Sequence, residues 1–265
     1  MNNSIDQLFN LRGKVAVITG GAGMLGQQHA EILSDAGAHV VIADIKQELC
    51  DPVAKKITDR NGVEAFGVEV DLSDEISVLK MVEKIKLKFG RIDILINNAV
   101  AKPKSFFKKF EEYPLDDWEQ VMTVNLRGVF LCSKIIGNEM VKQGKGIIVN
   151  IGSIYGIVGT DQSIYGSSGI NAPAVYAASK GAVINLTRYL ATYWAGKGIR
   201  VNTLSPGGVE NNQDAEFIIK YCANTPLQRM AQKDDFKGAL LFLVSDASAY
   251  MTGANLIVDG GWTAW

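Results

Sequence analysis

A tyrosine and a lysine one helical turn apart are the most chemically suggestive pair in the chain. Tyr176 and Lys180 lie in a stretch with helical periodicity, so both side chains should project from one side of a helix. A phenol normally titrates near pH 10, and lowering its pKa by about 3 units requires about 4 kcal/mol of preferential phenolate stabilisation. A neighbouring ammonium, with further positive charge from a bound cofactor, could supply it. The pair is a candidate proton donor and acceptor, although this spacing also occurs often by chance.

Two polar residues upstream extend this candidate site. Ser153 follows the apolar run 146–151, which is typical of a buried strand, and ligands bind at the carboxyl ends of strands in parallel sheets. Asn125 lies in the predicted helix 116–142. A buried helical asparagine is usually a satisfied packing residue, but it can also hold a water molecule. Both interpretations of Asn125 stay open.

A glycine-rich loop follows the first predicted strand and precedes a helix. Residues 19–26 read TGGAGMLG and include Gly20, Gly23, Met24, Leu25 and Gly26. Glycines let the backbone turn tightly and approach a pyrophosphate, whose charge is stabilised by the free N–H groups at the helix start. Glycine clusters also occur in ordinary turns, but the position between strand and helix favours a dinucleotide site.

Asp44 ends the second predicted strand, where dinucleotide-binding folds place the residue that binds the adenosine ribose. A carboxylate there accepts hydrogen bonds from the ribose hydroxyls and repels a 2′-phosphate. Lys46 is the only cation nearby, and no arginine follows Asp44 directly. The sequence therefore favours NAD over NADP as cofactor. The alternative is that Asp44 caps the next helix.

The elements that would position these residues alternate regularly along the chain. Seven short apolar runs read as buried strands, at residues 14–19, 39–43, 64–70, 92–96, 146–151, 199–204 and 255–258. Helical periodicity covers residues 25–36, 52–59, 75–89, 116–142, 174–196 and 234–243. Such alternation predicts an α/β fold with a parallel sheet and helices on both faces. Asp51 and Pro52 are expected to be the N-cap and the first-turn proline of the second helix.

Composition narrows the possible partners. The 27 basic and 28 acidic residues give a net charge of −1, so there is no electrostatic basis for binding nucleic acid or an anionic membrane. Cys50, Cys132 and Cys222 are scattered and are expected to be buried thiols rather than a disulfide framework. His29 and His39 are the only histidines, and neither lies in a cluster of metal ligands, so we expect no metal site.

Nothing in the sequence predicts export or a membrane span. Residues 1–10 lack the charged and apolar order of a signal peptide. The longest apolar runs fall far short of the roughly 20 residues that a spanning helix needs. We expect a cytoplasmic protein.

The chain resembles the short-chain dehydrogenase/reductase family over residues 11–261. Each matching motif is weak alone, but their order along the chain is specific. The matches are the loop 19–26, Asp71-Leu72, Asn97-Asn98-Ala99, Asn125, Ser153, Tyr176 with Lys180, Ser205-Pro206-Gly207, and Thr252-Gly253 leading to residues 258–261. The resemblance implies a Rossmann-type doubly wound sheet of seven parallel strands in a single domain, residues 1–265.

The resemblance also implies roles for the catalytic residues. Tyr176 would be the general acid/base, and Ser153 would hydrogen-bond the reacting oxygen. Lys180 would lower the pKa of the tyrosine and hold the nicotinamide ribose. Asn125 would anchor a water molecule in the proton relay.

Further residues would contact the cofactor. Asp71 would bind the adenine amino group, Leu72 would offer backbone contacts, and Asn98 would stand near the ribose. The backbone of Val209 would bind the carboxamide. The remaining expected contacts are Ala99, Pro206 and Gly207, with Tyr176 and Lys180 at the nicotinamide end.

The chain also departs from the family pattern. Met24 replaces the usual second loop glycine, Val100 replaces a glycine, and Asn211 stands near the position of a common threonine. Ser153 and Tyr176 are unusually far apart because of an extra segment, residues 160–173. Its polar side chains lead us to expect one wall of the substrate pocket, while a surface or subunit-contact loop is the alternative. Tyr155 and Tyr165 lack a lysine four residues on, so Tyr176 is the catalytic choice.

These features predict an oxidoreductase that moves a hydride between NAD(H) and an alcohol or ketone carbon of a small polar substrate, such as a sugar or sugar derivative. Lys102 and Lys104 suggest an anionic substrate or, equally, a solvated basic loop. The segment 207–226 is expected to be a substrate loop, and it is similar to bacterial members from surface-sugar and flagellin-modification pathways. The alternatives are an epimerase or dehydratase that retains NAD, and a non-catalytic dinucleotide-binding regulator. The resemblance implies a homotetramer.

Overall fold

A seven-stranded sheet runs through the centre of the computed structural model, which describes residues 4–265. Its strands are β1 (Val15–Thr19), β2 (His39–Asp44), β3 (Ala65–Glu69), β4 (Ile94–Asn97), β5 (Gly146–Ile151), β6 (Ile199–Pro206) and β7 (Asn255–Val258). The order across the sheet is β3-β2-β1-β4-β5-β6-β7, and every neighbouring pair is parallel. The predicted doubly wound sheet is confirmed, and the seven predicted strands differ from the observed ones only at their ends. The expectation that residues 1–10 do not form a signal peptide includes Met1–Asn3, which lie outside the described residues.

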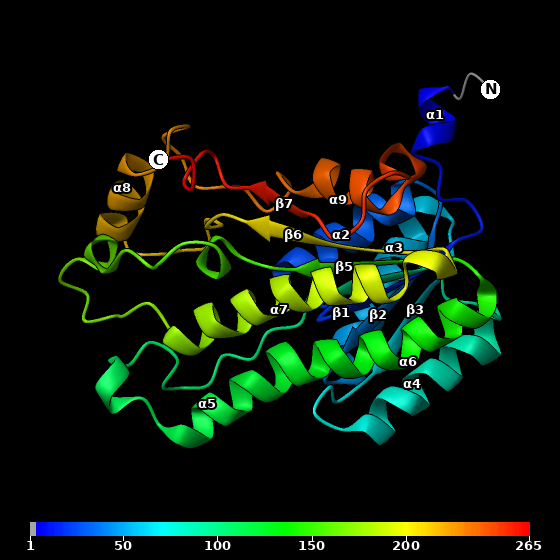
Figure 1. Ribbon diagram of the computed structural model, residues 1–265, viewed down its shortest axis with the longest axis horizontal. Helices are drawn as coiled ribbons and strands as arrows, with labels where there is room; N and C mark the ends of the chain where they lie inside the picture. Colours follow the sequence, from blue (N-terminus) through cyan, green and yellow to red (C-terminus); the bar gives the residue numbers. More distant parts are fainter. Residues whose placement is uncertain (1–3) are drawn as a thin grey trace.

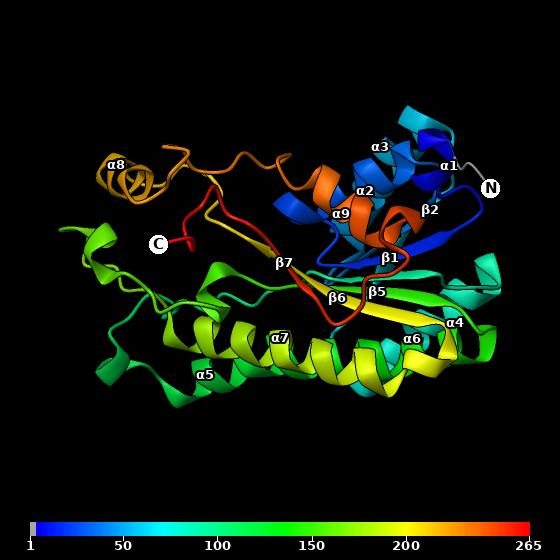
Figure 2. The same cartoon turned by 45° about the horizontal axis from the view of Figure 1, so that its top comes forward.

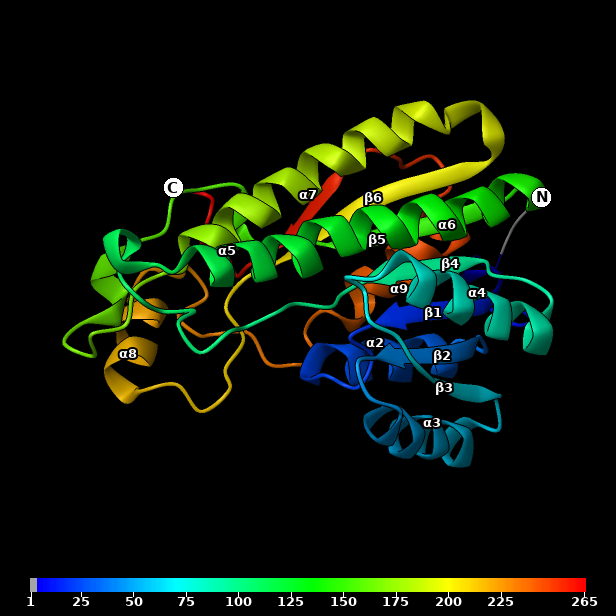
Figure 3. The same cartoon turned by 90° about the horizontal axis from the view of Figure 1, so that it is seen from below.

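The sheet is covered on both faces, which is why its central strands are mostly apolar. All residues of β1, β4 and β5 are buried. One face is covered by α4 (Glu75–Phe89), α5 (Leu115–Met122), α6 (Gly128–Gln143) and α7 (Ala174–Tyr193), and the other by α2 (Met24–Asp35), α3 (Gln47–Asn61) and α9 (Lys237–Val244) (Figures 1 and 2). Each layer has its own apolar core against the sheet. Seen from below, α4, α6 and α7 lie in front of the strands (Figure 3).

The strand order reverses between β1 and β4, and this topological switch point is where such sheets bind ligands. The short helix α8 (Ala215–Ala223) lies beyond the sheet, at the end of the molecule opposite α1 (Ile5–Leu8) (Figure 1). It packs on the turn Gln162–Tyr165 of the 160–173 segment. Apart from α8, the chain after β6 adds only α9, a short turn and β7.

The start of the helix α3 differs from the prediction. The helix begins at Gln47, so Pro52 lies inside it and Asp51 is not its N-cap. The Gln47 side chain explains the additional turn, because its amide donates to the Gly67 carbonyl at 2.9 Å and accepts from the Glu69 N–H at 2.9 Å. These bonds to β3 fix the helix start, so a proline further along is accommodated despite its missing donor.

Two other helical predictions were incomplete. The stretch 116–142 is not one uniform helix, because a π turn, Thr123–Arg127, separates α5 from α6. The helix α8 was missed, although Asp214 caps it by accepting from the Glu216 N–H at 2.8 Å. Its apolar spacing, with Phe217 and Tyr221 four residues apart, was the available signal.

The fold buries one histidine without a partner. His29 in α2 is 1% exposed, and neither ring nitrogen has a hydrogen-bond partner among residues 4–265. Burial lowers the pKa of His29 to about 4, from 6.5. Because the unfolded chain binds this proton more readily, the stability contributed by neutral His29 is full above pH 6.5 and is lost as the pH falls towards 4.

The unfolding free energy should therefore fall between pH 8 and pH 5, and His29 should account for about 2 kcal/mol of that fall. Urea unfolding of wild type and His29→Leu gives the unfolding free energy of each protein at both pH values. The fall in wild type minus the fall in His29→Leu is the contribution of His29. A His29→Leu variant that loses as much stability as wild type would contradict the assignment.

Within the described part of the chain, no helix is long and apolar enough to cross a membrane. Residues 4–265 also contain no group of three or more His, Cys, Asp or Glu side chains able to hold a metal ion. All three cysteines are free thiols. Cys50 and Cys132 are buried as expected, but Cys222 in α8 is only partly buried.

Candidate active site

The glycine-rich loop connects β1 to α2 in a form that only glycine can adopt at two positions. Gly20 has φ = 62°, and a Cβ there would lie 2.8 Å from the Ala99 Cα. A Cβ at Gly26 would overlap the Gly20 carbonyl oxygen. The first turn of α2 starts after Gly23 without a capping side chain. Its N–H groups are therefore free to meet an anion such as a pyrophosphate, so the loop fits a dinucleotide.

Side chains from the end of β4 brace this loop. The Asn98 side-chain amide donates to the carbonyls of Thr19 and Gly20, both at 3.0 Å, and the Asn98 backbone N–H donates to the Thr19 hydroxyl at 3.0 Å. Asn98 therefore spans the switch point between β1 and β4. Met24, at the position of the usual second loop glycine, is the first residue of α2 and lines the cavity described below.

Asp44 is positioned by the same loop. Its carboxylate accepts from the Ala22 N–H at 3.0 Å and from the Ile45 N–H at 2.8 Å. It does not cap α3, whose N-cap residue is Lys46, so the alternative role for Asp44 is excluded. Lys46 itself lies 3.5 Å from Glu48. A carboxylate pinned at this edge fits the ribose hydroxyls of NAD and would repel a 2′-phosphate.

A single cavity of about 1100 Å³ joins the two halves of the predicted site along the carboxyl edge of the sheet. Most of the predicted residues line it: Gly20, Gly23, Met24, Leu25, Asp44, Asp71, Leu72, Asn98, Ala99, Ser153, Tyr176, Lys180, Pro206, Gly207 and Val209. Two do not. Gly26 acts in loop packing, as described above, and Asn125 is buried elsewhere.

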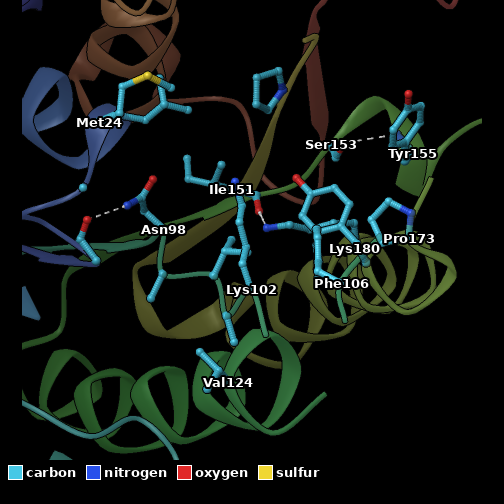
Figure 4. A pocket seen from close by; sticks show the side chains of 18 of the residues that line it. Met24, Asn98, Lys102, Phe106, Val124, Ile151, Ser153, Tyr155, Pro173 and Lys180 are labelled. Atoms are coloured by element: carbon cyan, nitrogen blue, oxygen red, sulfur yellow. Dashed lines mark hydrogen bonds between the residues drawn. The ribbon is translucent and has the colours of Figure 1, made fainter. Parts of the chain in front are cut away.

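Ser153, Tyr176 and Lys180 all line the cavity. Figure 4 shows Ser153 and Lys180 at one end of it, away from Met24 and Asn98. Ser153 follows β5 and accepts from the Tyr155 N–H at 3.2 Å. Lys180 is 3% exposed, and its ammonium donates to the Ile151 carbonyl at 2.6 Å. That ammonium lies 5.5 Å from the centre of the Tyr176 ring. The end of β5 and the first turns of α7 thus bring together three groups that are far apart in sequence.

Burial dominates the acid–base properties of this group. It raises the pKa of the Tyr176 phenol above its usual value, while the interaction with Ser153 acts in the opposite direction. Burial also lowers the pKa of Lys180 to about 8. The spacing of Tyr176 and Lys180 suggested that the lysine would help to lower the pKa of the phenol. The surrounding protein groups instead leave this pKa raised. The lowering would depend on the positive charge of a bound oxidised cofactor.

Asn125 occupies the π turn between α5 and α6. It is 1% exposed, and its side chain accepts from the Ala101 N–H at 2.9 Å and donates to the Ser179 hydroxyl at 3.4 Å. These bonds connect the segment after β4 to α7, as a packing residue would. Its role in holding a water molecule stays a prediction.

The substrate end of the cavity is more aromatic than the sequence suggested. Its lining includes Phe106, Phe107, Tyr155, Tyr165, Phe217, Tyr221 and Met230. Phe106 contacts the Tyr176 ring edge to face, with centroids 6.1 Å apart. Lys102 also lines the cavity, whereas Lys104 does not. Sequence reasoning missed Phe217 and Tyr221 because it missed α8, which carries both.

The polar side chains of the 160–173 segment are mostly engaged within the protein. Gln162 accepts from the Ala172 N–H at 3.0 Å, and Ser167 donates to Glu216 of α8 at 3.1 Å. Of this segment, only Tyr165 and Pro173 line the cavity. The segment contributes to the pocket wall through these two residues, and the polar groups expected to meet substrate instead hold the segment to itself and to α8.

Comparisons with known proteins agree with this geometry. Residues 21–263 match the family model described as enoyl-(acyl carrier protein) reductase. An NAD-dependent glycerol dehydrogenase from Listeria innocua is 35% identical, over 97% of each chain. A gluconate 5-dehydrogenase from Burkholderia cenocepacia, solved with NADP and tartrate, is 34% identical with a TM-score of 0.90, covering 99% of this chain and 100% of that one.

A short-chain type dehydrogenase/reductase from Mycobacterium marinum, also of known structure, is 30% identical. Its TM-score is 0.89, and the match covers 99% of this chain and 100% of that one. The family model and these relatives each span nearly the whole chain, and they agree with the strand order and with the ordered set of motifs. The chain belongs to the short-chain dehydrogenase/reductase family of oxidoreductases.

Proposed function

We propose that the chain is an NAD(H)-dependent dehydrogenase that interconverts an alcohol and a ketone on a small hydroxylated substrate. The observation that carries this proposal is the shared cavity. Its one end carries the glycine loop and Asp44, and its other end carries Ser153, Tyr176 and Lys180. A dinucleotide held along this edge would bring its nicotinamide close to the catalytic group.

The proposed roles are those that the family resemblance implies, and the positions of the side chains in the cavity are compatible with them. Bound NAD⁺ would supply the hydride acceptor. Ser153 would hold the substrate oxygen by a hydrogen bond, and the Tyr176 phenolate would accept the proton of the substrate hydroxyl as the hydride leaves the carbon. Lys180, anchored on the Ile151 carbonyl, would keep positive charge near the phenolate oxygen. In the reductive direction Tyr176 would return the proton to the oxygen.

The choice of NAD over NADP rests on this chain's own residues. The gluconate 5-dehydrogenase was solved with NADP, whereas the glycerol dehydrogenase is named as NAD-dependent, so the relatives point both ways. Here the Asp44 carboxylate lines the cavity, and among residues 4–265 no arginine lines it. Both features support NAD.

Relatives named for glycerol and gluconate support a hydroxylated substrate. The test is a panel of polyols, sugars and hydroxy acids offered with NAD⁺ and followed by NADH absorbance. Turnover of at least one polyol or hydroxy acid is expected. Absence of NADH formation with every compound, with bound NAD retained through gel filtration, would favour the epimerase alternative instead.

We also propose that the chain acts as a single dinucleotide-binding and catalytic domain in the cytoplasm and assembles as a homotetramer. Apolar side chains stand exposed on the covering helices, including Phe130 on α6 and the stacked pair Tyr189 and Tyr193 on α7. Further candidates lie on β7 and the C-terminal tail, at Ile257 and Trp265.

Light scattering at micromolar concentration should report four times the chain mass of 28.7 kDa. Charged substitutions at Tyr189 and Tyr193 should break the assembly into smaller units, because a charge desolvated at an apolar contact is costly. A wild-type mass equal to that of one chain would refute the proposed tetramer.

A further inference from the structure

Two tyrosine hydroxyls that the proposed chemistry does not use belong to the substrate end of the cavity. Tyr155 lies in the short turn Ile154–Gly156 directly after Ser153, and Tyr165 ends the turn Gln162–Tyr165. Both line the cavity together with Ser153 and Tyr176. Figure 4 shows Tyr155 beside Ser153. The extra segment of this chain therefore delivers a second phenol to the place where substrate would bind.

Tyr165 is held in position by several independent contacts. Its ring lies 5.2 Å from that of Phe217 in α8, and its carbonyl accepts from the Ser168 hydroxyl at 2.5 Å. Asp161 caps the turn by accepting from the Ser163 N–H at 2.9 Å, and it also accepts from Asn224 at 2.9 Å. The turn and α8 therefore form one packed unit, so the hydroxyl of Tyr165 is preorganised rather than free to swing away.

The hydroxyl of Tyr165 keeps its proton available. Burial raises the pKa of both phenols, and the interaction between them adds to the rise at Tyr155 while it opposes the rise at Tyr165. Because burial keeps the Tyr165 phenol protonated near neutral pH, its O–H is available as a hydrogen-bond donor in the cavity. A charge on Tyr165 would also raise the pKa of Tyr176, so the two phenols are electrostatic neighbours.

We propose that the Tyr165 hydroxyl binds a second oxygen of the substrate, on the carbon next to the one that is oxidised. The substrates would then be vicinal diols, and the products the corresponding α-hydroxy ketones. With one oxygen held by Ser153 and Tyr176, a neighbouring hydroxyl would accept from Tyr165, whereas a plain alcohol would leave that half-buried donor unpaired. Tyr155 would be a positioning residue that orients Tyr165. This inference rests on the proposed function, because it assigns a substrate class to the same site.

The test compares butane-2,3-diol with butan-2-ol, which differ by one hydroxyl, using the full-length enzyme and NAD⁺. Wild type should prefer the diol in kcat/KM. Tyr165→Phe should lower kcat/KM for the diol about 10-fold, a loss of about 1.4 kcal/mol, and change butan-2-ol less than about 2-fold. Tyr155→Phe should shift the same ratio in the same direction by a smaller factor. Tyr250→Phe, at a fully exposed position, is the matched control and should change neither substrate.

Each possible result bears on the proposal. Absence of butan-2-ol turnover in wild type would support it, provided that Tyr165→Phe impairs the diol. An equal loss for both substrates in Tyr165→Phe would assign the residue to the architecture of the pocket and overturn the proposal, as would no change for either. The proposed substrate class would be overturned if wild type oxidised butan-2-ol as well as the diol, or if it oxidised other alcohols but no vicinal diol. Either result would leave the proposed dehydrogenase activity standing. Titrations of NADH fluorescence and melting temperatures should be the same for all variants.

Discussion

Turnover of the Tyr176→Phe enzyme is expected to fall at least ~100-fold, while its fold and its affinity for NADH stay close to those of wild type. The substitution removes only the hydroxyl. The ring can keep its edge-to-face contact with Phe106, so packing is preserved. The lost oxygen is the one that would exchange a proton with the substrate, and Ser153 has no acidity or basicity suited to replace it near neutral pH. Single-turnover rates, with NADH binding measured by fluorescence, test both parts.

The matched controls are the two other phenols that line the same cavity. Tyr155→Phe and Tyr165→Phe should lose far less activity than Tyr176→Phe, at most about 10-fold, because among residues 4–265 the ammonium of Lys180 lies beside the Tyr176 ring and not beside theirs. If Tyr176→Phe keeps its activity and one of these two variants is inactive, the catalytic tyrosine has been wrongly assigned. A loss of NADH binding in Tyr176→Phe would show that the hydroxyl serves cofactor binding rather than proton transfer.

The fold could be predicted because its signals are local and repeated. Runs such as β1 and β5 are mostly apolar and are buried on both faces, and the helices between them leave few topologies for a parallel sheet. The candidate site followed from the same reasoning, since Ser153 and the glycine loop each end a strand. Strands that share one carboxyl edge bring such residues to a single cavity.

The errors arose where a distant partner overrides the local pattern. The helix α3 starts before Pro52 because Gln47 bonds to β3, a contact that proline rules cannot reveal. The polar residues of the 160–173 segment suggested substrate contacts, but Ser167 instead meets Glu216 of α8. Composition shows which side chains can form hydrogen bonds. Their partners are decided by the packing of segments that are remote in sequence.

The acid–base chemistry shows the same limit. The spacing of Tyr176 and Lys180 correctly places an ammonium beside the ring. Spacing does not show how completely the helix start buries both groups. Desolvation acts against both charged forms, raising the pKa of the phenol and lowering that of the lysine. We therefore expect the catalytic state of Tyr176 to depend on cofactor binding more strongly than the sequence pattern implies.

Cofactor choice should rest on the charge of Asp44, and we expect wild type to bind NADH on the order of 100-fold more tightly than NADPH, a difference of about 2.7 kcal/mol. At an effective dielectric constant of about 20, two unit charges 4 Å apart interact by about 4 kcal/mol, and solvent ions reduce that repulsion. The carboxylate cannot easily turn away, because N–H groups of Ala22 and Ile45 hold both of its oxygens. Titrating both cofactors by nicotinamide fluorescence measures the ratio.

Asp44→Asn is the sharper variant, because the amide oxygen can still accept from the Ala22 N–H while the charge is gone. It should tighten NADPH binding and narrow the preference to within about 10-fold, whereas Asp44→Ala should also weaken NADH by releasing the loop. Asp71→Asn is the matched control, because this carboxylate lines the same cavity beyond β3 and should affect the two cofactors alike. Wild type that binds NADPH more tightly, or an unchanged ratio in Asp44→Asn, would show that this carboxylate does not select the cofactor.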